Sequence, residues 1–371
     1  MWIKNLRLKD FRNYGVLDIN FSDKFNIIHG DNAQGKTNII EAMFLCSSGR
    51  SHRTSRDQEM VRNGTSGFEV AILLRKSDSE EEIGVSFTPE EKKRIRINGI
   101  KMKKIGSLMG HLNAVMFSPE DLMIIKQGPA ERRRFIDIAI SQIKPAYFYE
   151  LQQYARILFQ RNTMLREAID KRIDENMLDV WDVHLAKTGA KIIAERMSLI
   201  KRLDDFARLR HGQLTNHGEK LELIYKPSIN IDKNSKIEDI EDLFSETICR
   251  NRKEELRKGT TAAGPHRDDI DILLNGENTK VYGSQGQQRT SILSVKLGEI
   301  DLIKEEIGEF PVLLLDDVLS ELDAKRKEYL MDSVDGLQVF ITCTDRKFYS
   351  RDKKGAVFFH VRAGKVDTER E

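Results

Sequence analysis

A phosphate-binding sequence lies near the start of the chain. Residues 30–37 read Gly-Asp-Asn-Ala-Gln-Gly-Lys-Thr, the complete Walker A pattern G-x-x-x-x-G-K-T. Its glycines allow backbone N–H groups to surround phosphates. Lys36 is expected to reach the β- and γ-phosphates, and the Thr37 hydroxyl is expected to bind Mg²⁺. We therefore predict a site for ATP and Mg²⁺ formed by Gly30, Asp31, Asn32, Ala33, Gln34, Gly35, Lys36 and Thr37.

A pair of aspartates far downstream supplies the second half of such a site. The short apolar run at 312–315 ends in Asp316 and Asp317, and a run of this kind is typical of a buried parallel strand. A metal-binding aspartate belongs at the carboxyl end of that strand. We predict that Asp316 holds Mg²⁺ together with Thr37, and that Asp317 orients or deprotonates the attacking water. Lys36, Asp317 and Ser284, which is introduced below, are the predicted catalytic residues.

Two flanking segments must position the phosphate loop. Phe25–His29 has the composition of a buried strand, and residues 38–43 continue from the loop as a helix. A strand–loop–helix arrangement is the structural context that such a motif requires. The amino-terminal end of the helix would then direct its positive partial charge toward the phosphates.

Two further strings lie in a characteristic order. Residues 284–289 read Ser-Gln-Gly-Gln-Gln-Arg, and residues 320–323 read Ser-Glu-Leu-Asp. The first resembles the signature motif of ABC-type ATPases and the second resembles their D-loop. RecA-type and AAA-type motors lack this signature. The resemblance implies that a second subunit's nucleotide is contacted by the residues Ser284, Gln285, Gly286, Gln287 and Asp323.

Other strings are similar to one branch of these ATPases, the RecF family. The chain opens with RLKDFRNY at 7–14, as SMC-like and RecF-like ATPases open. Strings similar to RecF specifically are FSPEDL at 117–122, Gly-Pro at 128–129, RRRFID at 132–137, GPHRDD at 264–269 and SQGQQRT at 284–290. The resemblance covers both ends and the entry to the middle. It adds Arg12 and Asn13 to the expected nucleotide-binding residues.

The resemblance implies an ATP-dependent DNA-binding protein of recombinational repair and replication. ATP would close a homodimer on single-stranded or gapped duplex DNA, and slow, DNA-stimulated hydrolysis would release it. The implied partners are RecR and RecO, with loading of recombinase at gaps and support of the SOS response as the outcome. Two alternatives stay open: the nucleotide-binding subunit of an ABC transporter, and a scaffold that binds ATP without hydrolysing it.

Two departures from the ABC pattern affect the expected rate. The position that activates water, usually Glu, is Asp317, whose side chain is one methylene shorter. The histidine expected after the following strand is absent, because residues 341–345 read Ile-Thr-Cys-Thr-Asp and offer Thr344 instead. A poorly positioned water lowers the rate by orders of magnitude, so we expect slow turnover suited to a timer or switch.

The resemblance implies an α/β fold with an SMC/RecF-like ABC-type ATPase head, and the hydrophobic pattern adds a helical insertion lobe. Residues 1–119 and 256–371 would form the discontinuous ATPase lobe, and residues 120–255 the mainly helical insertion. Alternating strands dominate the first part, with a hairpin turn at Asn98 and Gly99. In the insertion, apolar residues such as Leu151, Tyr154 and Leu158 follow helical spacing.

The basic residues give weaker indications of DNA contacts. The three groups are Lys92, Lys93, Arg94, Arg96, Lys101, Lys103 and Lys104; Arg250, Arg252, Lys253, Arg257 and Lys258; and Lys201, Arg202, Arg208 and Arg210. Interleaved acids favour a solvated, salt-bridged surface for each group. The RRR of 132–134 could serve lobe packing, nucleotide or DNA. The GPHRDD string is interpreted as a structural or DNA-proximal loop, because His266 has no nucleophile nearby in sequence.

Composition excludes some protein classes. No apolar run approaches the roughly 20 residues needed to cross a bilayer, and the alternating start leaves no room for a signal peptide. The three cysteines are widely spaced, which predicts reduced, buried thiols in a cytoplasmic protein without a metal cluster. The net charge is only +2, from 61 basic and 59 acidic residues, so any DNA binding must use local patches.

Overall fold

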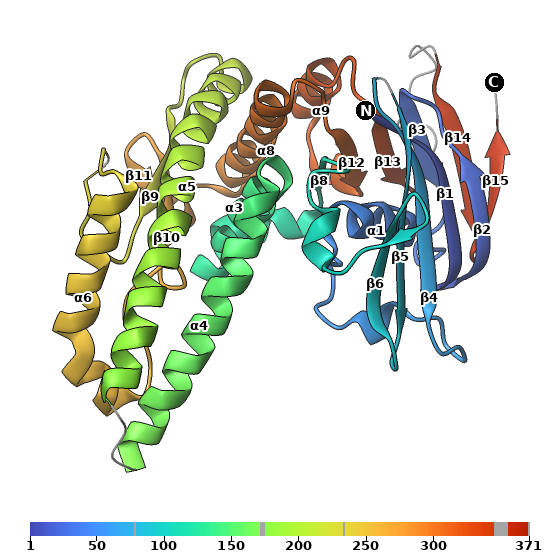
Figure 1. Cartoon of the computed structure of the whole chain (residues 1–371). Coiled ribbons are helices and arrows are strands. Elements are labelled where there is room, and N and C mark those ends of the chain that lie inside the picture. Colours follow the sequence, from blue (N-terminus) through green and yellow to red (C-terminus); the bar gives the residue numbers. More distant parts are fainter. Residues whose placement is uncertain (78, 171–174, 233, 345–354, 370–371) are drawn as a thin grey trace. The chain divides into compact units, whose positions relative to one another are not determined.

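The computed structural model describes residues 1–77, 79–170, 175–232, 234–344 and 355–369 (Figure 1). The chain forms two compact units. Unit 1 consists of residues 1–122 and 299–371, and unit 2 consists of residues 123–298.

A mainly parallel sheet forms the core of unit 1. Its strand order is β15-β14-β3-β13-β12-β8, and only β15 is antiparallel to its neighbour. All residues of β12 and β13 are buried, which explains their continuous Val, Leu, Ile and Phe content. The bounds are β3 (Phe25–His29), β8 (Ala114–Phe117), β12 (Val312–Asp316), β13 (Val339–Cys343), β14 (Val357–Arg362) and β15 (Lys365–Glu369).

Helix α1 (Lys36–Ser48) is the next element after β3, and most of its residues are buried. The carboxyl ends of β3, β13 and β12 lie side by side at one edge of the sheet, because the three strands are paired in parallel. This edge brings together the loop before α1 and the residues that follow β12. The remaining short elements of unit 1 are η1 (Asp57–Met60), η2 (Ile105–Leu108), η3 (Pro119–Leu122), η4 (Val318–Glu321) and α9 (Ala324–Ser333).

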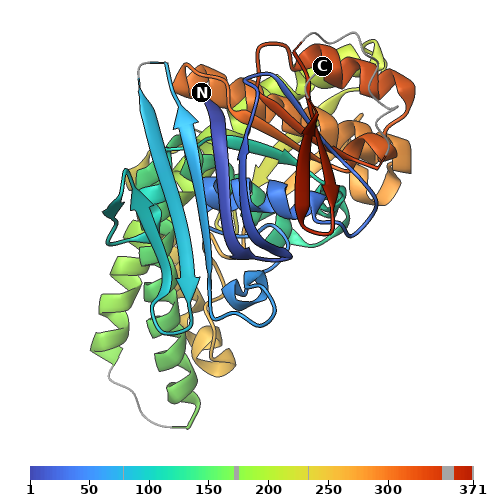
Figure 2. The ribbon, with the colours of Figure 1, turned by 90° about the vertical axis from the view of Figure 1, so that its right-hand side faces the viewer.

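The second sheet of unit 1 is antiparallel, with the order β2-β1-β4-β5-β6-β7. Figure 2 shows its long blue strands side by side. Alternate residues of β4 are buried, as expected when one face packs on a core. Asn98 and Gly99 both have positive φ, 51° and 77°, as the predicted tight hairpin requires. The bounds are β1 (Trp2–Phe11), β2 (Tyr14–Asn20), β4 (Phe68–Arg75), β5 (Glu80–Thr88), β6 (Lys92–Ile97) and β7 (Ile100–Lys101).

Unit 2 is built on long helices that flank a small sheet. Helices α4 and α5 are 26 and 41 residues long, and their buried residues include Leu165, Leu178 and Leu185. The sheet has the order β11-β10-β9. The bounds are α2 (Met123–Lys126), α3 (Pro129–Ile143), α4 (Pro145–Asp170), α5 (Glu175–Thr215), β9 (Leu221–Lys226), α6 (Ile237–Lys258), β10 (Asp269–Leu274), β11 (Glu277–Asn278), α7 (Thr279–Tyr282) and α8 (Gln285–Ile307), which ends in unit 1.

The observed division of the chain differs from the expected one at its second boundary. Residues 256–298 were expected in the ATPase lobe, but they group with unit 2. The reason is β9, a strand within the segment expected to be helical, which pairs with β10 from Leu221–Leu274 to Lys226–Asp269. The cysteines also differ in part: Cys46 and Cys343 are buried as expected, whereas Cys249 is exposed.

Candidate nucleotide site

The phosphate loop has a backbone that requires its glycines. It leaves β3 and enters α1 with φ of 145° at Gly30 and 117° at Gly35, values that side chains with a Cβ rarely adopt. A Cβ on Gly30 would lie 2.4 Å from the Val361 carbonyl oxygen. Ala33 also has a positive φ, 62°. The loop therefore carries its amides at the amino-terminal end of α1, where anions bind favourably.

Lys36 lies across this loop. Its Nζ donates hydrogen bonds to the carbonyl oxygens of Gly30 and Asp31, each at 2.8 Å. Burial lowers the pKa of Lys36, while Asp317 and other neighbouring acidic groups act in the opposite direction. The loop's own carbonyls thus hold the ammonium group over the surface on which phosphates would lie.

The metal-side residues are brought together across the sheet edge. Thr37 Oγ1 donates to Asp316 Oδ1 at 2.9 Å, and Thr342 Oγ1 donates to the same oxygen at 2.7 Å. Burial raises the pKa of Asp316 and outweighs the two threonine hydrogen bonds, and nearby Glu120 raises it further. A bound cation would offset this unfavourable charge.

Mg²⁺ suits this hard oxygen donor set of one hydroxyl and one carboxylate, since the ion usually keeps several waters and binds phosphate oxygens. In the described part of the chain there is no cluster of three His, Cys, Asp or Glu side chains that could hold a metal by itself. The remaining ligands would therefore come from nucleotide and water.

Asp317 occupies a left-handed backbone conformation, with φ of 53°, and is exposed. Its N–H donates to Thr342 Oγ1 at 2.9 Å, and its carbonyl accepts from Ser320 Oγ at 2.7 Å. Thr342 therefore contacts both aspartates, a role that the sequence analysis missed. Its only indication was its place on the strand beside β12, where it pairs in register with Asp316.

Arg12 and Asn13 contact protein groups around the loop. The guanidinium of Arg12 donates to the buried Glu41 carboxylate of α1 at 2.8 and 2.6 Å, and to the Glu59 carbonyl at 2.6 Å. Asn13 Nδ2 donates to the Gln34 carbonyl at 2.8 Å. The adjacent Tyr14 hydroxyl donates to the Gly35 carbonyl at 3.0 Å. These residues brace the loop, and their direct contact with nucleotide stays a prediction.

The rest of the loop is more open. Asp31, Asn32 and Ala33 are exposed. The side-chain oxygen of Gln34 accepts a hydrogen bond from the N–H of Ala363 at 2.7 Å, in the turn between β14 and β15. This contact fixes the middle of the loop to the sheet, while the exposed residues before it leave the loop accessible.

The signature residues belong to unit 2 and begin α8. Ser284 N–H donates to Gln287 Oε1 at 2.9 Å, and Gln287 N–H donates to Ser284 Oγ at 3.2 Å, which is a reciprocal capping box. Ser284 and Gln285 are exposed, whereas Gly286 is half-buried. The D-loop residue Asp323, in unit 1, caps α9 by accepting the Arg326 N–H at 2.9 Å.

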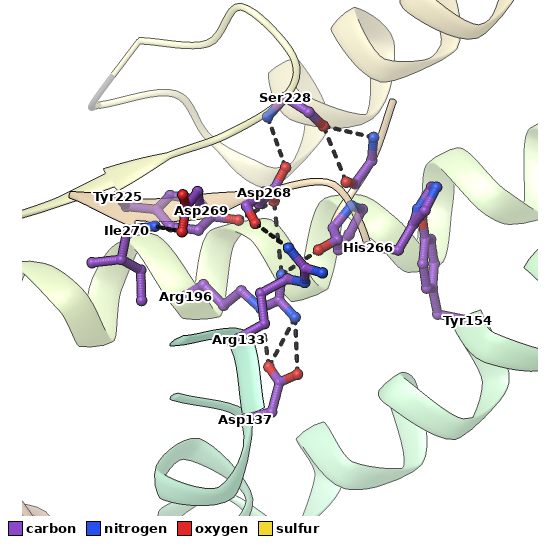
Figure 3. Close-up of polar contacts among 12 residues, drawn as sticks. Arg133, Asp137, Tyr154, Arg196, Tyr225, Ser228, His266, Asp268, Asp269 and Ile270 are labelled. Atoms are coloured by element: carbon purple, nitrogen blue, oxygen red, sulfur yellow. Dashed lines mark hydrogen bonds and ion pairs between the residues drawn. The ribbon is translucent and has the colours of Figure 1, made fainter. Parts of the chain in front are cut away.

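The RRRFID and GPHRDD strings form one polar cluster inside unit 2 (Figure 3). Arg133 donates to the Asp268 carbonyl at 2.7 Å. Arg196 of α5 donates to the Asp137 carboxylate at 3.0 and 2.9 Å and to the Pro265 carbonyl at 2.6 Å. These contacts join α3 and α5 to the loop before β10, so the cluster packs unit 2 together.

His266 in this cluster is half-buried. Burial lowers its pKa to about 4, and its Nδ1 lies 2.8 Å from the Tyr154 hydroxyl. Asp268 accepts the Ser228 N–H at 2.7 Å and the Tyr225 hydroxyl. The contacts support the interpretation of this string as a structural loop.

Several of the basic side chains considered for DNA binding are in ion pairs. Lys93 pairs with Asp57 at 2.6 Å, and Arg252 pairs with Asp179 at 2.5 Å. Arg94 pairs with Glu91 and Arg208 with Asp204. These pairs match the salt-bridged surface that the interleaved acids indicated. None of the described helices is long and apolar enough to cross a membrane.

Comparison with known proteins identifies the family. The model of the RecF/RecN/SMC N-terminal domain matches residues 2–366. The DNA replication and repair protein RecF of Acetivibrio thermocellus is 50% identical over 99% of this chain and 100% of its own length. The structure of the recombination mediator protein RecF–ATP in the RecFOR pathway matches with a TM-score of 0.93 at 38% identity, covering 100% of this chain and 98% of that one.

A structure of an SMC head bound to the C-terminal winged-helix domain of ScpA has a TM-score of 0.57 at 18% identity, covering 100% of this chain and 97% of that one. This distant match shows the shared fold alone. The predicted fold class, an SMC/RecF-like ATPase head with α/β architecture, is confirmed. The chain belongs to the RecF family.

Proposed function

We propose that this chain is an ATP-dependent DNA-binding protein of recombinational repair and replication. The observation that carries the proposal is the joined pair of Thr37 and Asp316, 2.9 Å apart beside a fully formed phosphate loop. Relatives that are named DNA replication and repair proteins support the cellular role. Bound ATP would supply the phosphoryl group, and Mg²⁺ would supply positive charge that stabilises it.

Each residue of the nucleotide site has a role that follows from its position. The amides of 30–37 would bind the phosphates, and Lys36 would exchange its two loop carbonyls for β- and γ-phosphate oxygens. Thr37 and Asp316 would hold the metal. Asp317 would accept a proton from the attacking water. Thr342 would keep the two aspartates in place, because its hydroxyl donates to the Asp316 carboxylate and accepts a hydrogen bond from the Asp317 backbone N–H.

Hydrolysis would be slow. Asp317 is one methylene shorter than glutamate, and Thr344 stands where a histidine would help to orient the water. Misplacing a water by such a distance costs orders of magnitude in rate. A slow step fits a protein whose bound state on DNA acts as a timer.

ATP would also join two copies of the chain. In a sandwich of the ABC type, the exposed Ser284 of one subunit would face the γ-phosphate held by the partner, supported by Gln285, Gly286 and Gln287. Asp323 of the D-loop would lie at the same interface. The closed homodimer would hold single-stranded or gapped duplex DNA in the cytoplasm, and hydrolysis would release it. By family relationship, RecR and RecO would be partners in loading recombinase and supporting the SOS response.

The first experiment measures steady-state phosphate release with and without gapped duplex DNA. Slow turnover that DNA stimulates is the expected result. No turnover in either condition would favour an ATP-binding scaffold. A turnover rate that DNA does not change would favour a transporter-type subunit. The long insertion between Walker A and the signature already argues against the transporter.

A second experiment tests the trans-acting signature. Ser284→Arg should leave ATP binding by the monomer nearly intact but prevent dimerisation and hydrolysis, because the larger side chain would clash with the partner's phosphates. ATP titration and sedimentation with ATP measure the two properties separately. If the variant dimerises and hydrolyses ATP normally, the trans-acting role of the signature is wrong.

A further inference from the structure

The turn that presents Ser284 is closed by a buried glutamine. Gln288 Nε2 donates to the Thr279 carbonyl at 3.1 Å and to the Gly283 carbonyl at 3.2 Å. Gln288 is only 7% exposed. The short helix α7 and the signature loop are thus locked to each other. Since α7 has only four residues, it is too short to be stable alone, so neighbouring contacts must decide its position.

A shared carbonyl supplies one of those contacts. The Gln127 carbonyl, at the end of α2, accepts Lys280 Nζ from α7 at 3.3 Å. The same oxygen accepts Arg132 Nη1 from α3 at 3.1 Å, and Arg132 Nη1 also donates to the Ile124 carbonyl at 3.0 Å. Arg132 therefore fixes the end of α2 against which α7 is held.

The other side of the Arg132 guanidinium reaches the sheet. Its Nε and Nη2 donate to the two carboxylate oxygens of Asp269 at 2.6 and 2.9 Å, a bidentate pair with defined geometry. Asp269 begins β10, which pairs with β11, and α7 follows β11 directly. Arg132 is only 8% exposed. Its guanidinium therefore links the end of α2 to the start of β10, the two segments that hold α7.

We propose that Arg132 and Asp269 are positioning residues for the signature serine. They do not touch nucleotide; they set the place of α7, and through Gln288 they set the orientation of the loop that carries Ser284. The inference rests on the proposed action of Ser284 across a dimer. It assigns to the first arginine of the RRRFID string, and to the last aspartate of the GPHRDD string, the task of preparing unit 2 for ATP-dependent dimerisation.

The principal test is the substitution Arg132→Lys. Lysine keeps the positive charge but cannot form the two parallel hydrogen bonds that the planar guanidinium makes to Asp269. Because one charge-assisted pair is lost, the protein concentration at which ATP produces half-maximal dimer should rise roughly tenfold. ATP affinity of the monomer should not change, since the phosphate loop is in unit 1. Amide hydrogen exchange over residues 279–288 should become faster, a local change that a loss of fold elsewhere would not mimic.

Arg156→Lys is the matched control, because Arg156 is an exposed arginine on α4 of the same unit, and it should leave both quantities unchanged. Asp269→Asn should reproduce the Arg132→Lys defect. The double variant should be no worse than either single variant if the two residues act as one pair. Lys280→Met, at an exposed position, should give a smaller shift in the same direction and should leave folding intact, because it removes a surface hydrogen bond to the Gln127 carbonyl.

The possible results separate this inference from the proposed function. If Ser284→Arg blocks dimerisation while Arg132→Lys and Lys280→Met dimerise and exchange like the wild type, the positioning role is wrong and the proposed function stands. If Ser284→Arg dimerises normally, the trans-acting role of the signature is wrong, and the inference that rests on it is overturned as well. If Arg132→Lys unfolds, Lys280→Met decides, and unchanged dimerisation in that variant overturns the inference.

Discussion

Replacing Arg12 with alanine should destabilise unit 1, because it leaves a buried carboxylate without its main partner. The Glu41 side chain is 0% exposed, and Arg12 is 19% exposed. Removing one partner of a buried ion pair costs about 3–5 kcal/mol. Ser51 and Arg53 still contact Glu41 in the variant, so we expect about 3 kcal/mol, or roughly a 150-fold larger unfolding constant.

The loss should depend on pH. Burial by itself raises the pKa of Glu41, but hydrogen bonds from Arg12 and Ser51 outweigh it and hold the pKa below the usual value. A carboxylate with a lowered folded-state pKa adds stability above its unfolded pKa, and this stability is lost as the pH falls. Without Arg12, burial dominates and Glu41 takes up a proton more readily. The deficit of the variant should therefore be largest near neutral pH and shrink toward about pH 4.

Urea unfolding followed by tryptophan fluorescence measures this effect. The chain has two tryptophans; in a Trp181→Phe background the remaining Trp2 lies in β1 and reports on unit 1. Arg12→Ala combined with Glu41→Gln is the control, because it removes the buried charge as well, and it should be more stable than Arg12→Ala alone. A loss at pH 7 below about 1 kcal/mol, or one that is the same at about pH 4, would refute the reasoning.

Four substitutions test the nucleotide site. Asp317→Asn should retain ATP and prolong the closed dimer, because the acceptor of the water proton is lost. Asp316→Asn should instead weaken the metal site. Light scattering with ATP compares the two variants, and identical behaviour would contradict the division of roles. Thr342→Val should weaken Mg²⁺-dependent binding of a non-hydrolysable ATP analogue about tenfold; calorimetric titration at several Mg²⁺ concentrations checks it, and an unchanged metal dependence disproves it. Lys36→Arg should strongly reduce nucleotide binding, because the guanidinium does not fit the cradle; equilibrium ATP affinity near that of the wild type would exclude this loop as the site.

Elements that depend on local interactions could be predicted from the sequence. The phosphate loop needs only the adjacent strand, glycines and helix start, and these are contiguous in the chain, so Phe25–His29 and α1 were recognisable. The hairpin at Asn98 and Gly99 depends on two residues that tolerate positive φ. The order of the motifs along the chain indicated an ABC-type ATPase, and the RecF-like strings indicated the family, which the comparisons confirmed.

Which distant groups meet depends on the three-dimensional fold. Strand β9 has six residues, and no local feature of its sequence indicates that it pairs with β10. The second domain boundary was therefore expected at residues 255–256, whereas the structure places it at residues 298–299. Thr342 and Glu41 became part of the site's surroundings through strand register and a buried ion pair. Hydrogen bonds of this kind join single side chains across long stretches of sequence, and a lone polar residue leaves no periodic pattern from which its partner could be predicted.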